Sequence, residues 1–362
     1  MTGFFGGDLV TGLVTVRNIP ARAGRVTTDL DAGSIGCDVG LPLTDPLTRV
    51  AVDIPNLLIP GRSFLAYEED GIILAAGPIW SDDYDFDSGR YTLNAAGLLS
   101  YFDYRYVLPV LTGGQLPADV TSTWTTSLRT MAKRLVEQCQ AWSPSLPIVF
   151  ESDVAGSNVR TYPGSDMMRV RDALTNLSNV QNGPDIVFRP EWADSTHVQW
   201  RLVTGDPLLT QSGHRHTWVT TVPGSSVKGV SVTRDATVLS GWDYESGDAG
   251  LGAVAADSTL TTAGYPLFQT RTARPSVILQ STVQDYADAA VVVGRSHLQT
   301  WAFSARKDQT PKLGEYWPGD LAAIQVPKNP RVAEGVHNLR IMSFTVNVGD
   351  EFVDIKFAPE RS

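Results

Sequence analysis

The sequence contains one order of turns and apolar segments twice, once near each end of the chain. Each copy has a Pro-Gly pair, an apolar strand, a second turn, a longer apolar strand, a tight turn and a closing strand, over 60–96 and 318–358. In the second copy the closing strand has Val353, Ile355 and Phe357 on one face. We interpret the two copies as one small β-barrel that occurs twice. A chance likeness is the alternative, because β-meanders of this kind recur in unrelated folds.

Helical periodicity interrupts this pattern of strands. Apolar residues at a spacing of three and four predict helices over 128–142, 167–177 and 286–301. Ser165 or Asp166 is the expected N-cap of the second helix, and Gly294 weakens the third. Short β-type segments surround these helices. We therefore expect an α+β fold, mostly β, with two small related β-barrels flanking an α+β middle domain.

A chain of 362 residues is longer than one hydrophobic core usually serves. We expect three units, with the second barrel interrupted by a helical insertion that packs with the middle domain. The expected bounds are 1–110 for the first β-barrel, 111–222 for the middle domain, 223–362 for the second β-barrel and about 260–303 for the insertion.

Composition excludes several classes of protein. Hydrophobic residues make up 42% of the chain, too many for a disordered protein, and 32 Gly with 22 Pro favour short strands over a coiled coil. The net charge of −10 argues against a protein that wraps nucleic acid with basic patches. Cys37 and Cys139 are too few for a disulfide framework. We find no signal-peptide pattern and no apolar run of about 20 residues, so we expect no membrane insertion by this chain.

Two clusters deserve a test as metal sites. The acidic run from Asp82 to Asp87 lacks the glycine and glutamate spacing of a calcium loop, and alternation explains it better as an acidic hairpin edge with Tyr84 and Phe86 on one side. His214 and His216 share one face of a strand, but no nearby carboxylate or thiol completes a site, so a polar strand face is favoured. No motif of a catalytic site occurs. We expect no catalytic, metal or cofactor residues.

Two segments of the chain carry a resemblance to a known family. The segment from Ala76 to Trp80, the acidic hairpin and the passage from Ala95 through Gly97-Leu98-Leu99-Ser100-Tyr101-Phe102 to Pro109 resemble the minor tail proteins, or tail-tip (baseplate) hubs, of long-tailed (siphovirus) actinobacteriophages. The C-terminal segments 316–320 and 335–341 are similar to the closing barrel of the same family. Each motif is loose by itself, but together they span nearly the whole chain.

The resemblance implies a structural virion protein and not an enzyme. It implies a homotrimer at the tail tip, joining the six-fold tail tube to the three-fold tip and forming a conduit for DNA ejection without sequence-specific DNA binding. The implied partners are the distal tail protein ring, the tape measure protein and other minor tail proteins, and the implied place of synthesis is the host cytoplasm. Some hubs carry a hydrolase or receptor-binding extension, whereas this chain ends at Ser362, so we expect no lytic role.

Aromatic residues between the first barrel and the middle domain are candidates for subunit contacts, although they serve equally well as core residues of the first barrel. The candidate interface residues are Tyr101, Phe102, Tyr104, Arg105, Tyr106 and Trp317. The competing function is an envelope-targeted carbohydrate-binding or glycan-hydrolysing protein, which the nine Trp residues permit.

Overall fold

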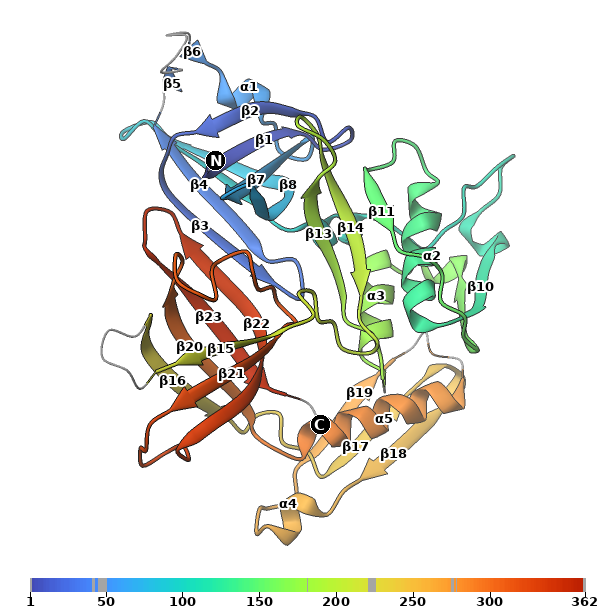
Figure 1. The fold of residues 1–362 in the computed structure, drawn as a ribbon. Helices are drawn as coiled ribbons and strands as arrows, with labels where there is room; N and C mark the ends of the chain where they lie inside the picture. Colours follow the sequence, from blue (N-terminus) through green and yellow to red (C-terminus); the bar gives the residue numbers. More distant parts are fainter. Residues whose placement is uncertain are drawn as a thin grey trace.

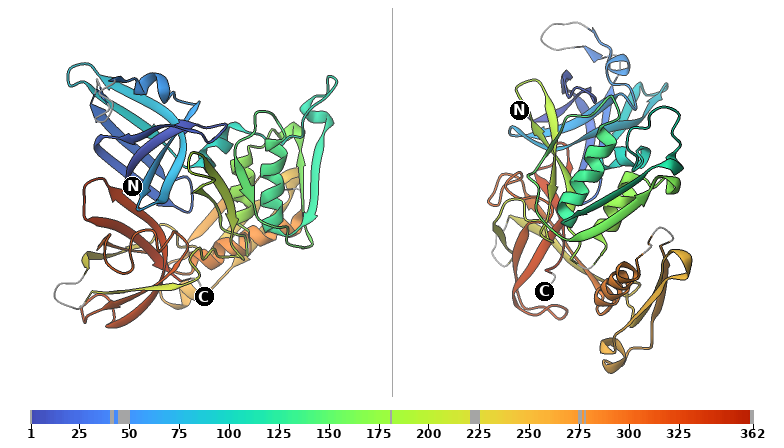
Figure 2. Two further views of the ribbon diagram at one scale, coloured as in Figure 1. Left: turned by 45° about the horizontal axis from the view of Figure 1, so that its top comes forward. Right: turned by 90° about the vertical axis from the view of Figure 1, so that its right-hand side faces the viewer.

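The computed structural model describes residues 2–360 except 41–42, 45–50, 181, 221–225, 275–276 and 278. The fold is mostly β with few helices, and thirteen strands of the described residues join in one sheet (Figure 1). The sheet has two parts, which we call the N-terminal and the C-terminal β-unit. A middle domain and a smaller α/β layer lie beside them (Figure 2).

The N-terminal β-unit contains the strands with the hydrogen-bonded order β3-β4-β9-β8-β7-β1-β2. The chain passes from β2 to β3 through Pro20 alone, so a covalent link joins the two ends of this order. Short elements between β4 and β7 are β5 (Leu43–Thr44), β6 (Ala51–Val52) and α1 (Ile54–Leu57). The seven strands are β1 (Gly3–Asp8), β2 (Val14–Ile19), β3 (Ala21–Asp29), β4 (Ser34–Gly40), β7 (Ser63–Glu69), β8 (Ile72–Asp85) and β9 (Arg90–Ala95).

The C-terminal β-unit has the order β16-β20-β23-β22-β21-β15. Strand β15 runs parallel to β21, and the other neighbours are antiparallel. Its strands are β15 (Arg215–Val219), β16 (Val227–Asp235), β20 (Leu298–Arg306), β21 (Leu321–Val326), β22 (Gly335–Asn347) and β23 (Phe352–Pro359).

The two units repeat one strand order. Five antiparallel strands, β3-β4-β9-β8-β7, match β16-β20-β23-β22-β21 both along the chain and across the sheet. A β-bulge lies at the same place in each, between Ile79 and Ser81 in β8 and between Ile341 and Ser343 in β22. Because bulges fix register and bend a strand, a shared bulge is a more specific likeness than shared strand number. The order of elements found in the sequence is therefore a repeated topology.

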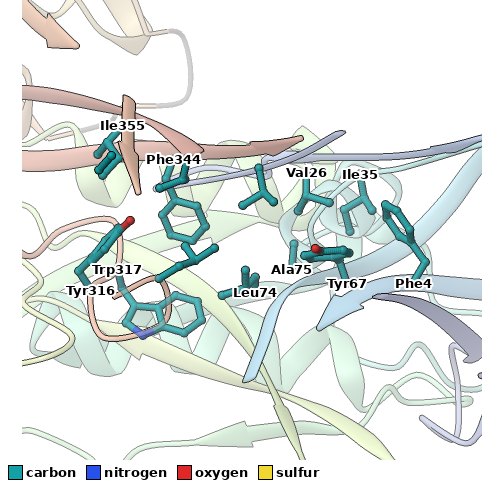
Figure 3. Packing of buried hydrophobic residues seen from close by; sticks show 14 of the residues in the cluster. Phe4, Val26, Ile35, Tyr67, Leu74, Ala75, Tyr316, Trp317, Phe344 and Ile355 are labelled. Atoms are coloured by element: carbon teal, nitrogen blue, oxygen red, sulfur yellow. The ribbon is translucent and has the colours of Figure 1, made fainter. Parts of the chain in front are cut away.

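The two separate β-barrels that the sequence predicts are not confirmed. Among the described residues no closed barrel is found, and β22 pairs with β3 so that the two units share one sheet. Buried residues of both units also form one hydrophobic cluster (Figure 3). Among the residues drawn, Phe4 and Tyr67 lie on one side and Tyr316 and Phe344 on the other, with Val26 between them.

The middle domain packs two helices against a three-stranded sheet of order β11-β14-β13. Ser127 caps α2 by accepting the backbone N–H of Thr130 at 3.2 Å. The helix α3 begins at Val170, later than the sequence predicts, because Met167 adopts a left-handed φ of 45° that a helix cannot contain. The elements are β10 (Thr121–Thr126), α2 (Leu128–Gln140), β11 (Ile148–Phe150), β12 (Asn158–Pro163), α3 (Val170–Ser178), β13 (Ile186–Trp192) and β14 (Val198–Thr204), with 3-10 turns over Leu98–Tyr104, Pro117–Asp119 and Gly164–Asp166.

The α/β layer lies between β16 and β20 in the sequence. The helix expected over 286–301 ends at Gly294, and Trp301 lies in strand β20. Trp301, Phe303 and Ala305 are buried at every second position, which is the period of a strand, so the helical spacing does not continue past Gly294. The layer consists of β17 (Trp242–Ser246), a 3-10 turn (Asp248–Gly250), β18 (Gly252–Ala256), α4 (Thr259–Thr262), β19 (Gln269–Ala273) and α5 (Gln280–Gly294).

A second hydrophobic cluster fixes the middle domain to the N-terminal β-unit. The Trp200 indole of β14 is fully buried, lies edge-to-face with Phe64 at 5.7 Å and donates its N–H to the carbonyl of Ala76 at 3.0 Å. In the other direction, Arg340 of β22 reaches Asp185 beside β13. The middle domain is thus attached to both β-units.

Candidate assembly interface

The junction between the two β-units is a direct pairing of two strand edges. Residues Ser343–Asn347 of β22 lie antiparallel to residues Arg25–Asp29 of β3, with Val346 opposite Val26 and Thr345 opposite Thr27. Both valines are fully buried, and the two threonine hydroxyls lie 3.0 Å apart. An edge of one unit therefore accepts an edge of the other through backbone hydrogen bonds supported by apolar and hydroxyl pairs.

The second half of β8 presents an edge of the opposite character. Residues Ser81–Asp85 pair with β9, and within the described chain no strand pairs with their other side. Asp82, Asp83 and Asp85 are exposed there. Asp82 accepts the hydroxyl of Tyr91 at 2.6 Å, and burial together with this carboxylate raises the pKa of Tyr91. The acids leave this edge negatively charged.

An exposed aromatic pair continues the edge of β8 at the hairpin tip. The Tyr84 and Phe86 rings lie 5.1 Å apart, and Phe86 is 88% exposed. The adjoining turn is closed by Asp85, which accepts the Ser88 hydroxyl at 2.7 Å. Tyr84 and Phe86 thus form a small exposed aromatic pair beside the charged edge.

Strand β16 forms a second edge. Its described residues pair with β20, and β16 ends the strand order of the sheet. Lys228 and Arg234 are exposed on it, whereas Val232 packs against the shared hydrophobic cluster. The edge carries basic residues where the edge of β8 carries acidic ones.

Sequence reasoning did not single out β16. A signal for it is present, because Val232-Thr233-Arg234-Asp235 repeats the spacing of Val26-Thr27-Thr28-Asp29 in β3. Asp29 and Asp235 also act alike, since each carboxylate accepts the backbone N–H two residues later at 2.8–2.9 Å, from Asp31 and Thr237 respectively.

The six residues predicted as an interface do not lie together. Phe102 is fully buried and stacks on Phe188 at 4.9 Å, and Trp317 is buried beneath the Arg189 guanidinium at 4.2 Å. Phe102 packs against the middle domain, and Trp317 packs inside the chain next to Phe344.

The remaining four residues lie around the start of the middle domain. The Arg105 guanidinium donates to the Tyr101 hydroxyl and to the carbonyl of Cys139 at the end of α2. Tyr104 is 66% exposed with its ring 4.8 Å from Trp80, and Tyr106 is also exposed. Arg105 therefore holds α2 in place, and the two tyrosines are the candidates that leave most surface uncovered.

The histidine pair has structural contacts. His216 lies 3.0 Å from the Ser212 hydroxyl and 3.9 Å from the buried Asp320 carboxylate, and burial lowers the pKa of His216. Within the described ranges, no group of three or more His, Cys, Asp or Glu is arranged to hold a metal ion. In the same part of the chain, no helix is long and apolar enough to cross a membrane.

The sequence matches no protein-family model and no curated protein. The structure, however, is similar over nearly its whole length to three solved tail proteins. The 43 kDa tail protein of prophage MuSo2 from Shewanella oneidensis has a TM-score of 0.61 at 11% identity, over 99% of this chain and 98% of that one. A tail protein from Neisseria meningitidis has 0.57 at 13% identity, over 99% and 96%. A prophage tail protein from Listeria monocytogenes has 0.53 at 9% identity, over 99% and 95%.

At these identities the likeness shows a shared fold. The tail-protein fold that the sequence resemblance implies is therefore confirmed. None of the three proteins bears on the narrower assignment to long-tailed actinobacterial phages.

Proposed function

We propose that this chain is a structural virion protein, the subunit of a homotrimeric tail-tip hub of a long-tailed phage. The observation that carries the proposal is the repeated strand order of the two β-units. It is supported by the full-length likeness to tail proteins of three bacteria.

The repeated strand order is suited to a ring that connects a six-fold tube to a three-fold tip. A three-fold ring of chains that each contain two similar units presents six similar surfaces on one side and three-fold symmetry on the other. Such a ring can adapt a six-fold tube to a three-fold tip. The direct β22–β3 pairing supports this proposal, because it places the two units in one continuous sheet.

The ring would serve as a conduit for DNA. The net charge of −10 suits a channel that DNA passes without binding, since like charge repels the phosphates. The proposed neighbours are the distal tail protein ring, the tape measure protein and other minor tail proteins, and the proposed location is the tail tip of the virion.

We retain the division into three units with an inserted layer as part of the proposal, with 1–110 as the first unit. Because β15 (Arg215–Val219) pairs with β21, the C-terminal unit includes β15 and does not start at 223, and the inserted layer covers 242–294 and not about 260–303. Two contacts support packing of the insertion on the middle domain. Tyr286 of α5 donates its hydroxyl to the carbonyl of Asn176 at 2.9 Å, and Arg160 donates to the Thr282 hydroxyl at 3.3 Å. Tyr104 and Tyr106 remain the proposed subunit contacts of the original six residues.

Light scattering after size-exclusion chromatography tests the oligomer, and negative-stain images test its shape. We expect three times the mass of one chain and a ring with an axial opening. The competing function is an envelope-directed glycan-binding or glycan-hydrolysing protein. A monomer that binds or cleaves purified peptidoglycan would replace the hub proposal with this one.

A further inference from the structure

We propose that the edge of β8 (Ser81–Asp85) in one chain pairs with the edge of β16 (Ser231–Asp235) in a second copy, antiparallel and in the register that joins β22 to β3 within the chain. The inference rests on the proposed homotrimeric ring, and it identifies the two strand edges through which neighbouring chains of that ring contact each other. Because the two β-units share one strand order, the pairing of two edges within the chain indicates how the equivalent edges pair between chains.

The first step is that β8 is the equivalent of β22. In each strand the last pair before the bulge is an isoleucine, Ile79 or Ile341, and the first pair after it is a serine, Ser81 or Ser343. The following residues continue in step against β9 and β23. Residues 81–85 of β8 thus correspond one by one to residues 343–347 of β22, the segment that accepts β3.

The second step is that β16 is the equivalent of β3. Ile35 of β4 and Trp301 of β20 occupy the same place against β9 and β23, and the residues opposite them are Val26 and Val232. The hydrogen-bond register therefore aligns Val232 with Val26. The repeated Val-Thr-x-Asp sequence gives the same alignment independently.

The third step transfers the observed register to the two remaining edges. Within the chain, Phe344 lies opposite Thr28, Thr345 opposite Thr27 and Val346 opposite Val26. The equivalent contacts between chains place Asp82 opposite Arg234, Asp83 opposite Thr233 and Tyr84 opposite Val232.

Each of these new pairs is chemically matched. The Asp82 carboxylate faces a guanidinium, and the Thr233 hydroxyl can donate to the Asp83 carboxylate as the Thr27 and Thr345 hydroxyls bond each other. Tyr84 covers Val232 at the position where two valines meet within the chain. A shift by one residue would lose this match, because it moves every side chain to the other face of the sheet.

A second copy is the occupant, and not another part of the same chain. In the strand order β16-β20-β23-β22-β3-β4-β9-β8, six strands separate the two edges. The pairing is also head-to-tail, since two β8 edges would place Asp82, Asp83 and Asp85 against acids of the same kind. A head-to-tail contact between unlike edges is the type that builds a closed ring.

Disulfide trapping in the full-length protein tests the register. Directly opposite residues in an antiparallel pair have Cα atoms about 4.5–5.5 Å apart, within the range that a disulfide bridges. The native thiols of Cys37 and Cys139 are buried and do not compete. Two variants, Tyr84→Cys and Val232→Cys, are purified separately, mixed in equal amounts and mildly oxidised. We expect a crosslinked dimer in the mixture, neither variant crosslinking alone, with the 84–232 linkage identified by mass spectrometry.

The matched control replaces Val232→Cys with Thr233→Cys, one residue along and on the opposite face of β16. We expect at least a tenfold lower yield of crosslinked dimer with this partner. Equal yields from the two mixtures, or no linkage in either, would overturn the proposed register.

Light scattering of the same samples separates this inference from the function it rests on. A trimer that fails to give the 84–232 linkage overturns the edge pairing and leaves the hub in place. A linkage in an assembly that is not three-fold supports the pairing and overturns the trimer. A monomer without linkage overturns both.

Discussion

Arg340 of β22 offers the most quantitative test of how the middle domain is held to the C-terminal β-unit. Its side chain is 7% exposed, and its guanidinium donates to Asp185, to the Leu209 carbonyl at 3.1 Å and to the Gly319 carbonyl at 3.0 Å. Replacing it with alanine removes the donors from two buried carbonyls and leaves Asp185 without its cation. Removing one partner of a buried ion pair typically costs about 3–5 kcal/mol.

Asp185 decides where in that range Arg340→Ala falls. Its side chain is 22% exposed and still accepts the Leu209 N–H at 2.7 Å, so water and one backbone donor partly replace the lost cation. We therefore expect the lower end, about 3 kcal/mol. The assay is urea denaturation followed by circular dichroism, with the change read from the transition midpoint.

Arg215→Ala is the matched control for Arg340→Ala. Arg215 lies in the same β-unit and pairs with Glu360 at 3.0 Å, but its side chain is 35% exposed, where an ion pair contributes about 0–1 kcal/mol. If the two variants lose the same stability, the buried contacts of Arg340 do not hold the domains together and the reasoning is wrong.

Three further predictions test other parts of the structure. Gly77→Ala should lower the free energy of unfolding by at least about 2 kcal/mol, because its Cβ would lie 1.9 Å from the Ala96 carbonyl oxygen. In the control Gly36→Ala the new Cβ meets nothing closer than 3.8 Å, so its thermal denaturation should be nearly unchanged. Burial raises the pKa of the Cys37 and Cys139 thiols to about 12, so iodoacetamide at pH 8 should label neither in the folded protein and both in urea, as read by mass spectrometry. Arg234→Glu should weaken assembly by about 1 kcal/mol per joint by opposing Asp82, and Asp82→Arg in the same chain should restore it, as measured by the concentration at half-assembly.

The sequence predicted those helices whose position depends on local spacing of apolar residues and on capping. The apolar spacing from Leu128 onward predicted α2 nearly to its last residue, because that helix buries one face and has a serine cap. The third helix was extended too far because the run Val291-Val292-Val293 leads into a strand whose apolar residues also fit a helical stripe at single positions. Apolar periodicity alone does not distinguish a helix from a strand when the strand begins a few residues after the helix ends.

The junction of the two β-units was beyond the reach of the sequence. Thr27 and Thr345 are 318 residues apart, and the bonds that join their strands are backbone bonds that carry no residue-specific signature. The acidic edge of β8 was recognised from alternation, but its counterpart in β16 was not, since two basic residues in a mixed strand do not stand out. The strand pairing reveals that the edge of β8 is equivalent to that of β22 and the edge of β16 to that of β3.

The edge residues of β22 and β8 differ because the first edge is covered during folding and the second only during assembly. The β22 edge meets β3 within the chain and is covered as the protein folds. Apolar residues such as Phe344 and Val346 can therefore lie there without exposing an apolar edge to other proteins. An edge that waits for another chain stays exposed until assembly, and an apolar exposed edge pairs with wrong partners. At the equivalent positions β8 carries Asp82 and Tyr84, which keep the waiting edge soluble and still match Arg234 and Val232. Charge at the position of Asp82 therefore disfavours pairing with a wrong partner before the edge with Arg234 arrives.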